Sequence, residues 1–170
     1  MKRLPVLAAV PLFLIAAATA TSAQPQPPAG CRAAIDARLP GWQLSPPPPD
    51  LAEVAKQKKI STNVVQSDFD DNGTRDTAVL VVVPGTGELH PRQRIAVCLS
   101  QAGKINLHVI GDPYCGDGIS VVPKGTRAWD FTTEKRVTYW TSGVSAYCYE
   151  KAGGTYLFRD GKFVLIVDSD

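Results

Sequence analysis

The chain has 170 residues, of which 18 are Lys or Arg and 16 are Asp or Glu. Two of the basic residues, Lys2 and Arg3, lie in an N-terminal segment that we expect to be removed. The remaining chain then carries 16 residues of each sign and has no net charge. A nucleic-acid-binding protein needs a concentrated positive surface, which this composition argues against, and the same balance disfavours binding to anionic membranes.

Residues 1–23 have the three parts of a secretory signal peptide. Lys2 and Arg3 form the basic start, residues 4–18 are apolar, and residues 21–23 (TSA) supply the small side chains of a cleavage site before Gln24. The alternative is a membrane anchor, because the uncharged stretch is about 20 residues long. Its last third is only weakly apolar, however, and no basic flank follows it. We therefore predict a periplasmic or secreted protein with no membrane span after signal cleavage.

Four cysteines, at positions 31, 98, 115 and 148, all lie in the part that we expect to be exported. An oxidising compartment favours disulfides, and the absence of a CxxC pair argues against zinc. Four cysteines allow three pairings, and their spacing does not choose among them. We favour Cys115 with Cys148 and Cys31 with Cys98.

After a Pro-rich lead-in at residues 24–30, two short helices are expected. Residues 31–39 (CRAAIDARL) have helical spacing and end at Pro40 and Gly41. Four prolines at 46–49 precede the second helix, in which Asp50 and Glu53 have the spacing of a capping box. Both helices belong to one domain, residues 31–170.

The rest of this domain reads as β structure. Residues 77–83 (TAVLVVV) form a continuous apolar run, which is typical of a strand buried on both faces. Strands are also expected at 94–99 and 105–110, followed by an irregular segment at 111–129. A four-stranded meander then closes the chain, with strands at 137–140, 144–151, 156–159 and 162–167. The predicted fold class is α+β: a mainly antiparallel β meander with one or two short N-terminal helices.

Residues 68–76 (DFDDNGTRD) are the most informative segment of the chain. Side chains that carry oxygen recur at alternate positions, at Asp68, Asp70 and Asn72. Thr74 can offer its backbone carbonyl oxygen, and Asp76 completes the set. Calcium takes about six to eight oxygen ligands from a flexible loop, and alternate spacing in a tight turn directs carboxylates to one centre. The complete EF-hand pattern fails, because the twelfth loop position is Val79 instead of a glutamate. The alternative is an Asx-rich turn that binds nothing.

This segment resembles the calcium-binding loop of FG-GAP and VCBS-type repeats, written DxNxDGxxD and followed by an apolar strand. The corresponding residues are Asp68, Asp70, Asn72, Gly73 and Asp76. Asp and Asn are exchanged at the third and fifth positions of the pattern, and both residue types supply oxygen. The resemblance implies a Ca²⁺ ion held beside the start of the strand at 77–83. It covers only about 16 residues and occurs once, whereas a propeller needs several repeats. The propeller fold itself is therefore not implied.

Signals for catalysis are weaker. His90 and His108 are the only histidines, and neither sits in a recognisable catalytic motif. Asp112 and Asp117 share one loop with Cys115, and two carboxylates could act on a glycoside if they lay about 5 to 9 Å apart. A turn anchored by the cysteine is the alternative.

Aromatic residues gather in the last third of the chain and could form a face that binds a sugar or a protein; core packing is the alternative. They are Trp129, Tyr139, Trp140, Tyr147, Tyr149 and Tyr156. We expect an exported, non-enzymatic binding or structural domain with a calcium loop and an unidentified protein or glycan ligand. The alternative is a small secreted hydrolase acting on polysaccharide or peptidoglycan.

Overall fold

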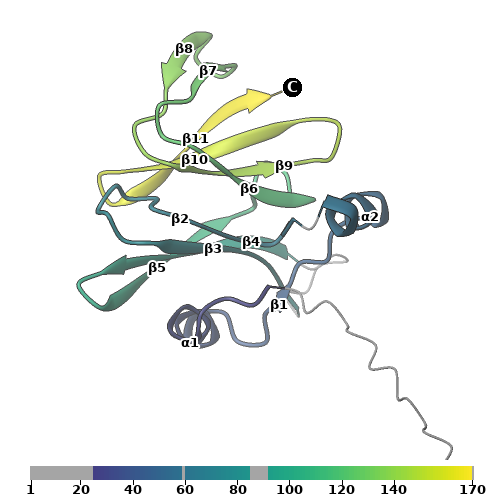
Figure 1. Cartoon of the computed structure of the whole chain (residues 1–170), viewed down its shortest axis with the longest axis vertical. Helices are drawn as coiled ribbons and strands as arrows, with labels where there is room; N and C mark the ends of the chain where they lie inside the picture. The colour runs from purple at the N-terminus through teal and green to yellow at the C-terminus, as the bar shows by residue number, and fades with distance from the viewer. Residues whose placement is uncertain (1–24, 59, 85–91, 170) are drawn as a thin grey trace, which may run out of the picture.

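Helix α1 (Ala29–Arg38), two antiparallel sheets and a short hairpin form four layers along the long axis of the molecule (Figure 1). The computed structural model describes residues 25–58, 60–84 and 92–169. The predicted signal peptide, residues 1–23, lies outside these residues, as does His90. The mainly antiparallel β character and the two short N-terminal helices expected from the sequence are confirmed.

The first sheet lies against α1 and is built around a central strand. Its path runs β1-β3-β4-β5, and β2 pairs with β3 on the same side as β1. Strand β2 pairs with the first half of β3, where Ser67 lies opposite Asp76. Strand β1 pairs with the second half, where Leu44 lies opposite Val81. The strands are β1 (Gln43–Leu44), β2 (Val64–Ser67), β3 (Asp76–Val83), β4 (Arg92–Gln101) and β5 (Lys104–Gly111).

The second sheet has the order β11-β10-β9-β6. Its strands are β6 (Gly118–Val122), β9 (Gly143–Tyr147), β10 (Gly153–Arg159) and β11 (Lys162–Ser169). Only three of the four strands of the predicted C-terminal meander belong to it. The predicted first strand is instead β8 (Lys135–Thr138), which pairs with β7 (Arg127–Asp130) in a separate hairpin on the outer face of this sheet.

The segment at 111–129, expected to be irregular, therefore contains two strands, β6 and β7. Gly118 and Pro123 lie at the two ends of β6 and leave its interior uninterrupted. Strand β9 is also shorter than predicted. It ends at Tyr147, because the chain turns at Cys148, whose N–H donates to the carbonyl oxygen of Ala152.

Strand β3 is buried on both faces, as its unbroken apolar sequence predicts. Ala78 and Leu80 point into the core between the two sheets, where they meet residues of the second sheet such as Ile119. Val79 and Val81 point the other way, toward Ile35 of α1. Each of these six residues is at most 1 % exposed to solvent. Strand β3 thus links the core between the sheets to the core beneath α1.

Both disulfides have the pairing that we favoured. Cys31 of α1 is bonded to Cys98 of β4, and Cys115 is bonded to Cys148. In the chain-entropy treatment, closing loops of 67 and 33 positions stabilises the fold by about 4 kcal/mol each. The first bond holds α1 on the first sheet, and the second joins the loop before β6 to the end of β9.

The two sheets are joined along one edge and separate along the other. At the joined edge the N–H of Ile119 in β6 donates to the carbonyl oxygen of Thr62, at 2.8 Å. At the other edge, between β5 and the β10–β11 hairpin, His108 lies edge-on to Phe158 and Phe163, with ring centroids 5.3 and 5.8 Å away. Aromatic packing, instead of backbone pairing, closes this side.

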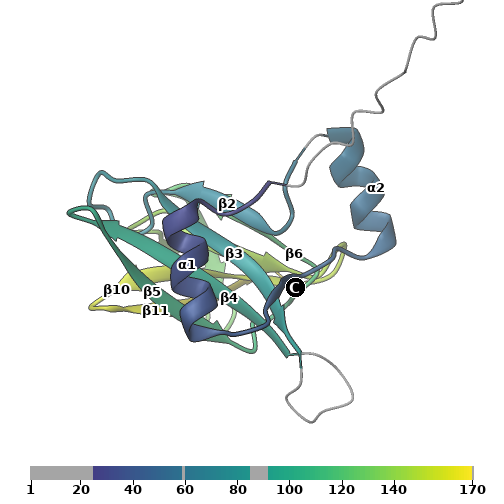
Figure 2. The same cartoon turned by 90° about the horizontal axis from the view of Figure 1, so that it is seen from below.

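Helix α2 (Pro49–Lys58) stands beside the sandwich (Figure 2). It begins at Pro49, so Asp50 lies in its first turn instead of at the predicted N-cap. Proline suits the first helical position because the N–H it lacks has no partner within the helix there. No helix in the described ranges is long and apolar enough to cross a membrane.

Two glycines allow a matched test of the packing. At Gly143 an added Cβ would lie 2.3 Å from a methyl carbon of Thr155 and 2.8 Å from one of Leu157. At Gly30, exposed in the first turn of α1, the nearest atom would be 3.5 Å away. We predict that Gly143→Ala lowers the free energy of unfolding by about 1 to 3 kcal/mol. Gly30→Ala should instead raise it by about 0.5 to 1 kcal/mol. Urea unfolding of both variants would measure this, and equal effects would contradict the packing described.

His108 gives the fold a dependence on pH. Burial lowers its pKa from the ordinary 6.5, and the charge of Asp70 opposes this only in part. The unfolded chain therefore binds a proton more readily than the folded one, and stability falls as the pH drops through and below 6.5. We predict that His108→Phe, which keeps an aromatic ring between Phe158 and Phe163, loses less stability between pH 7.5 and 5.5 than the parent protein. Urea unfolding at both pH values measures the difference, and an equal loss in both proteins would show that His108 is not responsible.

Candidate metal site

The Asp-rich segment forms the loop between β2 and β3, and its middle is anchored in the core. Phe69 is fully buried between the two sheets, and its N–H donates to Oδ2 of Asp76 at 2.8 Å. The flanking side chains of Asp68 and Asp70 are only partly buried. The backbone at Asp71 and Gly73 has φ values of 63° and 82°, the left-handed conformation that tight turns require.

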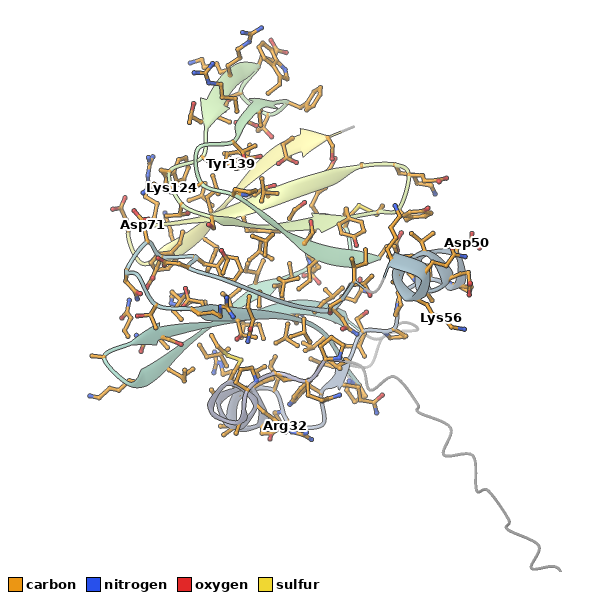
Figure 3. All side chains as sticks on the ribbon, viewed as in Figure 1. Arg32, Asp50, Lys56, Asp71, Lys124 and Tyr139 are labelled. Atoms are coloured by element: carbon orange, nitrogen blue, oxygen red, sulfur yellow. A yellow bond between two sulfur atoms is a disulfide. The ribbon has the colours of Figure 1, made fainter. Side chains whose placement is uncertain are left out.

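Three carboxylates converge in this loop. Asp68, Asp70 and Asp76 each offer an oxygen atom, and these atoms lie within 4.8 Å of one another. This carboxylate trio could hold a metal ion. Asp71, the remaining aspartate of the loop, lies outside the trio and pairs with Lys124, whose Nζ is 2.5 Å from its Oδ2 (Figure 3).

Asp76 is the deepest member of the trio, and its side chain has two backbone partners. Oδ2 accepts the N–H of Phe69, and Oδ1 accepts the N–H of Ser100 at 2.7 Å. Burial raises the pKa of Asp76 above 3.8, the charges of Asp70 and Asp68 add to this, and the two backbone N–H groups oppose it. The negative charge of the trio is therefore only partly compensated by the loop itself.

Strand β4 supplies contacts to the loop that sequence reasoning missed. Besides the N–H of Ser100, the side chain of Gln101 donates to Oδ2 of Asp70 at 2.8 Å. These residues lie 24 and 31 positions from their partners, so no local pattern could reveal them. The loop is thus fixed to the next strand of the first sheet as well as to β2 and β3.

The other two predicted ligands are placed differently. Asn72 turns its amide nitrogen toward Oδ2 of Asp70 and the carbonyl oxygen of Ser100, while its Oδ1 accepts the N–H of Thr74. Its side chain would have to rotate by half a turn to present oxygen to an ion held by Asp70. Thr74 is exposed. The N–H groups of Asn72 and Gly73 donate to Asp68, so the Asx-type hydrogen bonds of the alternative interpretation are also present.

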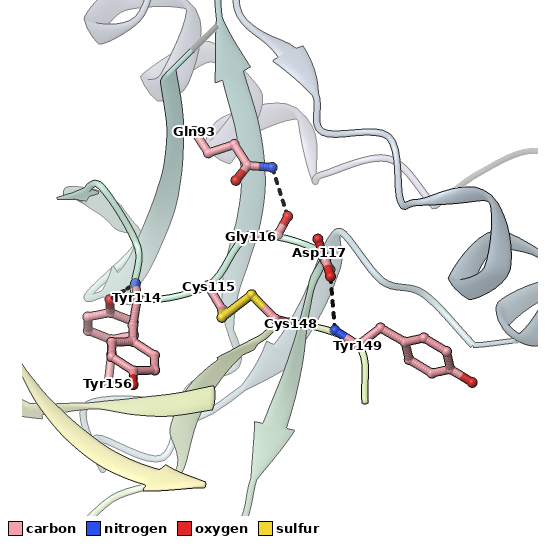
Figure 4. Close-up of a disulfide and its surroundings, with 8 residues drawn as sticks. All are labelled: Gln93, Tyr114, Cys115, Gly116, Asp117, Cys148, Tyr149 and Tyr156. Carbon is pink, nitrogen blue, oxygen red and sulfur yellow. Dashed lines mark hydrogen bonds between the residues drawn. A yellow bond between two sulfur atoms is a disulfide. The ribbon is translucent and has the colours of Figure 1, made fainter. Parts of the chain in front are cut away.

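The loop that suggested a hydrolase is held by structural contacts (Figure 4). Asp117 accepts the N–H of Tyr149 at 2.9 Å, next to the disulfide between Cys115 and Cys148. The side chain of Gln93 donates to the carbonyl oxygen of Gly116 at 2.7 Å. Asp112, whose side chain is exposed, instead forms an ion pair with the mostly buried side chain of Arg94. Each carboxylate thus has its own partner.

The six aromatic residues of the last third do not share one face. Tyr156 belongs to the core between the sheets, and its hydroxyl accepts the N–H of Tyr114. Tyr139 is buried on the outer side of the second sheet. Its hydroxyl donates to Asp168, which also accepts the hydroxyl of Thr155. Of the six, only Trp129 is largely exposed, at 44 %. Core packing therefore accounts for part of this group.

Comparison of the chain with protein-family models, with curated proteins and with solved structures gives no match.

Proposed function

We propose that this protein is an exported, non-enzymatic binding or structural domain whose Asp-rich loop binds Ca²⁺. The observation that carries the proposal is the convergence of Asp68, Asp70 and Asp76 within 4.8 Å. The two disulfides support export, because such bonds persist in oxidising compartments.

The donor set fits calcium better than a transition metal. All three side chains offer hard carboxylate oxygens, and neither cysteine sulfur nor histidine nitrogen belongs to the cluster. Carboxylates that already accept N–H groups keep free lone pairs, so these hydrogen bonds do not prevent coordination. A bound Ca²⁺ would neutralise the charge at Asp76 and hold the β2–β3 loop against the end of β4.

Calcium should stabilise the protein measurably. Extracellular calcium modules bind with a Kd of about 10⁻⁴ to 10⁻³ M. At ten times Kd, binding adds about 1.4 kcal/mol to the free energy of unfolding, which for a domain of this size raises Tm by about 3 to 6 °C. We predict such a rise when Ca²⁺ is added to the protein after treatment with EDTA. Isothermal titration and thermal unfolding would measure it, and the absence of both heat and a Tm shift would refute the calcium site.

Two neighbouring aspartates provide a matched pair of variants. Asp70→Asn removes one charge from the trio with almost no change of shape, and we predict that it weakens the response to Ca²⁺ at least tenfold. Asp71→Asn removes the same charge one position later, outside the trio, and asparagine tolerates the left-handed backbone there. It should retain the response of the parent protein. Equal loss in both variants would indicate only a general effect of loop charge.

Protons should compete with calcium. Because the pKa of Asp76 is raised above 3.8, this carboxyl takes up a proton at a higher pH than an ordinary aspartate. Protonation favours the metal-free folded state in that window and opposes coordination. We predict that the Tm difference between samples with and without Ca²⁺ shrinks as the pH is lowered from neutral toward 4. A difference that stays constant over this range would argue against Asp76 as a ligand.

A further inference from the structure

The hairpin β7–β8 presents one face to solvent at the end of the molecule opposite α1 (Figure 1). In this hairpin Arg127 pairs with Thr138, and Trp129 pairs with Arg136. Residues directly opposite one another in an antiparallel pair share a face. These four residues are all exposed, whereas Ala128 and Val137, which form the pair between them, are partly buried against the second sheet. We call Arg127, Trp129, Arg136 and Thr138 the hairpin platform.

The two arginines of the hairpin platform have no ion-pair partner among the described residues. Within the same part of the chain, neither guanidinium makes a side-chain hydrogen bond. The nearest acidic residue along β7, Asp130, is 4 % exposed and on the alternate face. It accepts the N–H of Thr132 and the hydroxyl of Thr133, and the hydroxyl of Thr133 is the main cause of its lowered pKa. The carboxylate of Asp130 is therefore already hydrogen-bonded within the turn.

The backbone holds the hairpin platform in place before any ligand arrives. The N–H of Phe131 donates to the carbonyl oxygen of Val167 in β11, at 2.9 Å. At the other end, the N–H of Tyr139 donates to the carbonyl oxygen of Thr126. A preformed surface loses little conformational entropy on binding. Trp129, which is 44 % exposed, and the two neighbouring guanidiniums thus form a surface that needs little reorganisation to bind a partner.

We propose that the hairpin platform binds an acidic polysaccharide, with a sugar ring stacked on Trp129 and sugar carboxylates bound by Arg127 and Arg136. A guanidinium matches a carboxylate with two parallel hydrogen bonds, and the indole offers a large apolar surface to the C–H face of a sugar. The hydroxyl of Thr138 is available to a sugar hydroxyl. This proposal names a ligand for the binding domain proposed above, and it does not depend on the calcium site.

Two other anionic partners fit less well. Insertion into a membrane would need an apolar hairpin tip. The turn that joins the strands exposes Phe131, at 48 %, but its other three residues, Thr132, Thr133 and Glu134, are polar and also exposed. A double-stranded nucleic acid carries one charge per about 1.7 Å and needs a broad basic surface. The hairpin platform offers only two arginines beside one exposed indole, a smaller basic surface than a double helix requires.

The test is isothermal titration of the protein, purified after export with both disulfides formed, against oligogalacturonate in EDTA. We expect binding that weakens as salt is added, and no binding to the methyl-esterified oligogalacturonate, which has the same sugars without charge. Arg127→Ala, Arg136→Ala and Trp129→Ala should each weaken binding about tenfold. Because the three side chains are exposed, the Tm of each variant should stay close to that of the parent protein.

A matched control is Arg32→Ala, an exposed arginine on α1 at the far end of the molecule (Figure 3), which should leave the affinity unchanged. The proposal is overturned if oligogalacturonate does not bind, if the platform variants bind as well as Arg32→Ala, or if anionic vesicles or an oligonucleotide bind more tightly through the same residues. Because EDTA removes Ca²⁺, binding of oligogalacturonate is measured independently of the calcium site. The calcium proposal is tested only by the response of the protein to Ca²⁺.

Discussion

Strand β3 has no face toward water, and most of the architecture follows from this constraint. An isolated sheet with such a strand would expose valines on one side or the other, so both sides must be covered. The second sheet covers one face of β3 and α1 covers the other. A single ten-residue helix buries little apolar surface, and the bond between Cys31 and Cys98 holds it there covalently. The second sheet in turn needs a cover on its outer face, which the β7–β8 hairpin provides.

At the Asp-rich loop, the burial of β3 conflicts with the negative charge of the aspartate side chains. Strand β3 must begin at the edge of the core, and its first residue is an aspartate with no exposed surface. Phe69 fixes the loop from the core side, and backbone N–H groups from the loop and from β4 meet Asp76. The hydrogen bonds to Asp76 offset part of the free-energy cost of burying its carboxylate. Repulsion from the nearby carboxylates of Asp68 and Asp70 adds to that cost again. A divalent cation bound by the three carboxylates would resolve this imbalance, which is why we propose calcium for the loop.

The sequence predicted features that depend on neighbouring residues better than features that depend on distant ones. The run at 77–83 specified a doubly buried strand, and Asp160-Gly161 specified the turn between β10 and β11, because each pattern is local. Strands β6 and β7 were not predicted, because the glycine and proline residues near their ends are typical of loops. The trio of carboxylates could be expected from alternate spacing, whereas the contacts from Ser100 and Gln101 depend on pairing that only the fold creates. Nothing local distinguishes exposed Trp129 from buried Tyr139, since the difference depends on which strand faces which sheet.

The connectivity of the disulfides has a consequence for how the chain matures. The bonds join the first cysteine to the second and the third to the fourth, so the two covalent loops follow one another and do not interlock. During the export proposed above, the chain would cross a membrane with its N-terminus leading and present its thiols in that same order. Each cysteine that arrives second in a pair then finds a single free thiol ahead of it, and oxidation as the chain emerges gives the native pairing directly. Such a protein can mature without an isomerase to reshuffle wrong bonds, and the first bond closes only after β4 has emerged to receive α1.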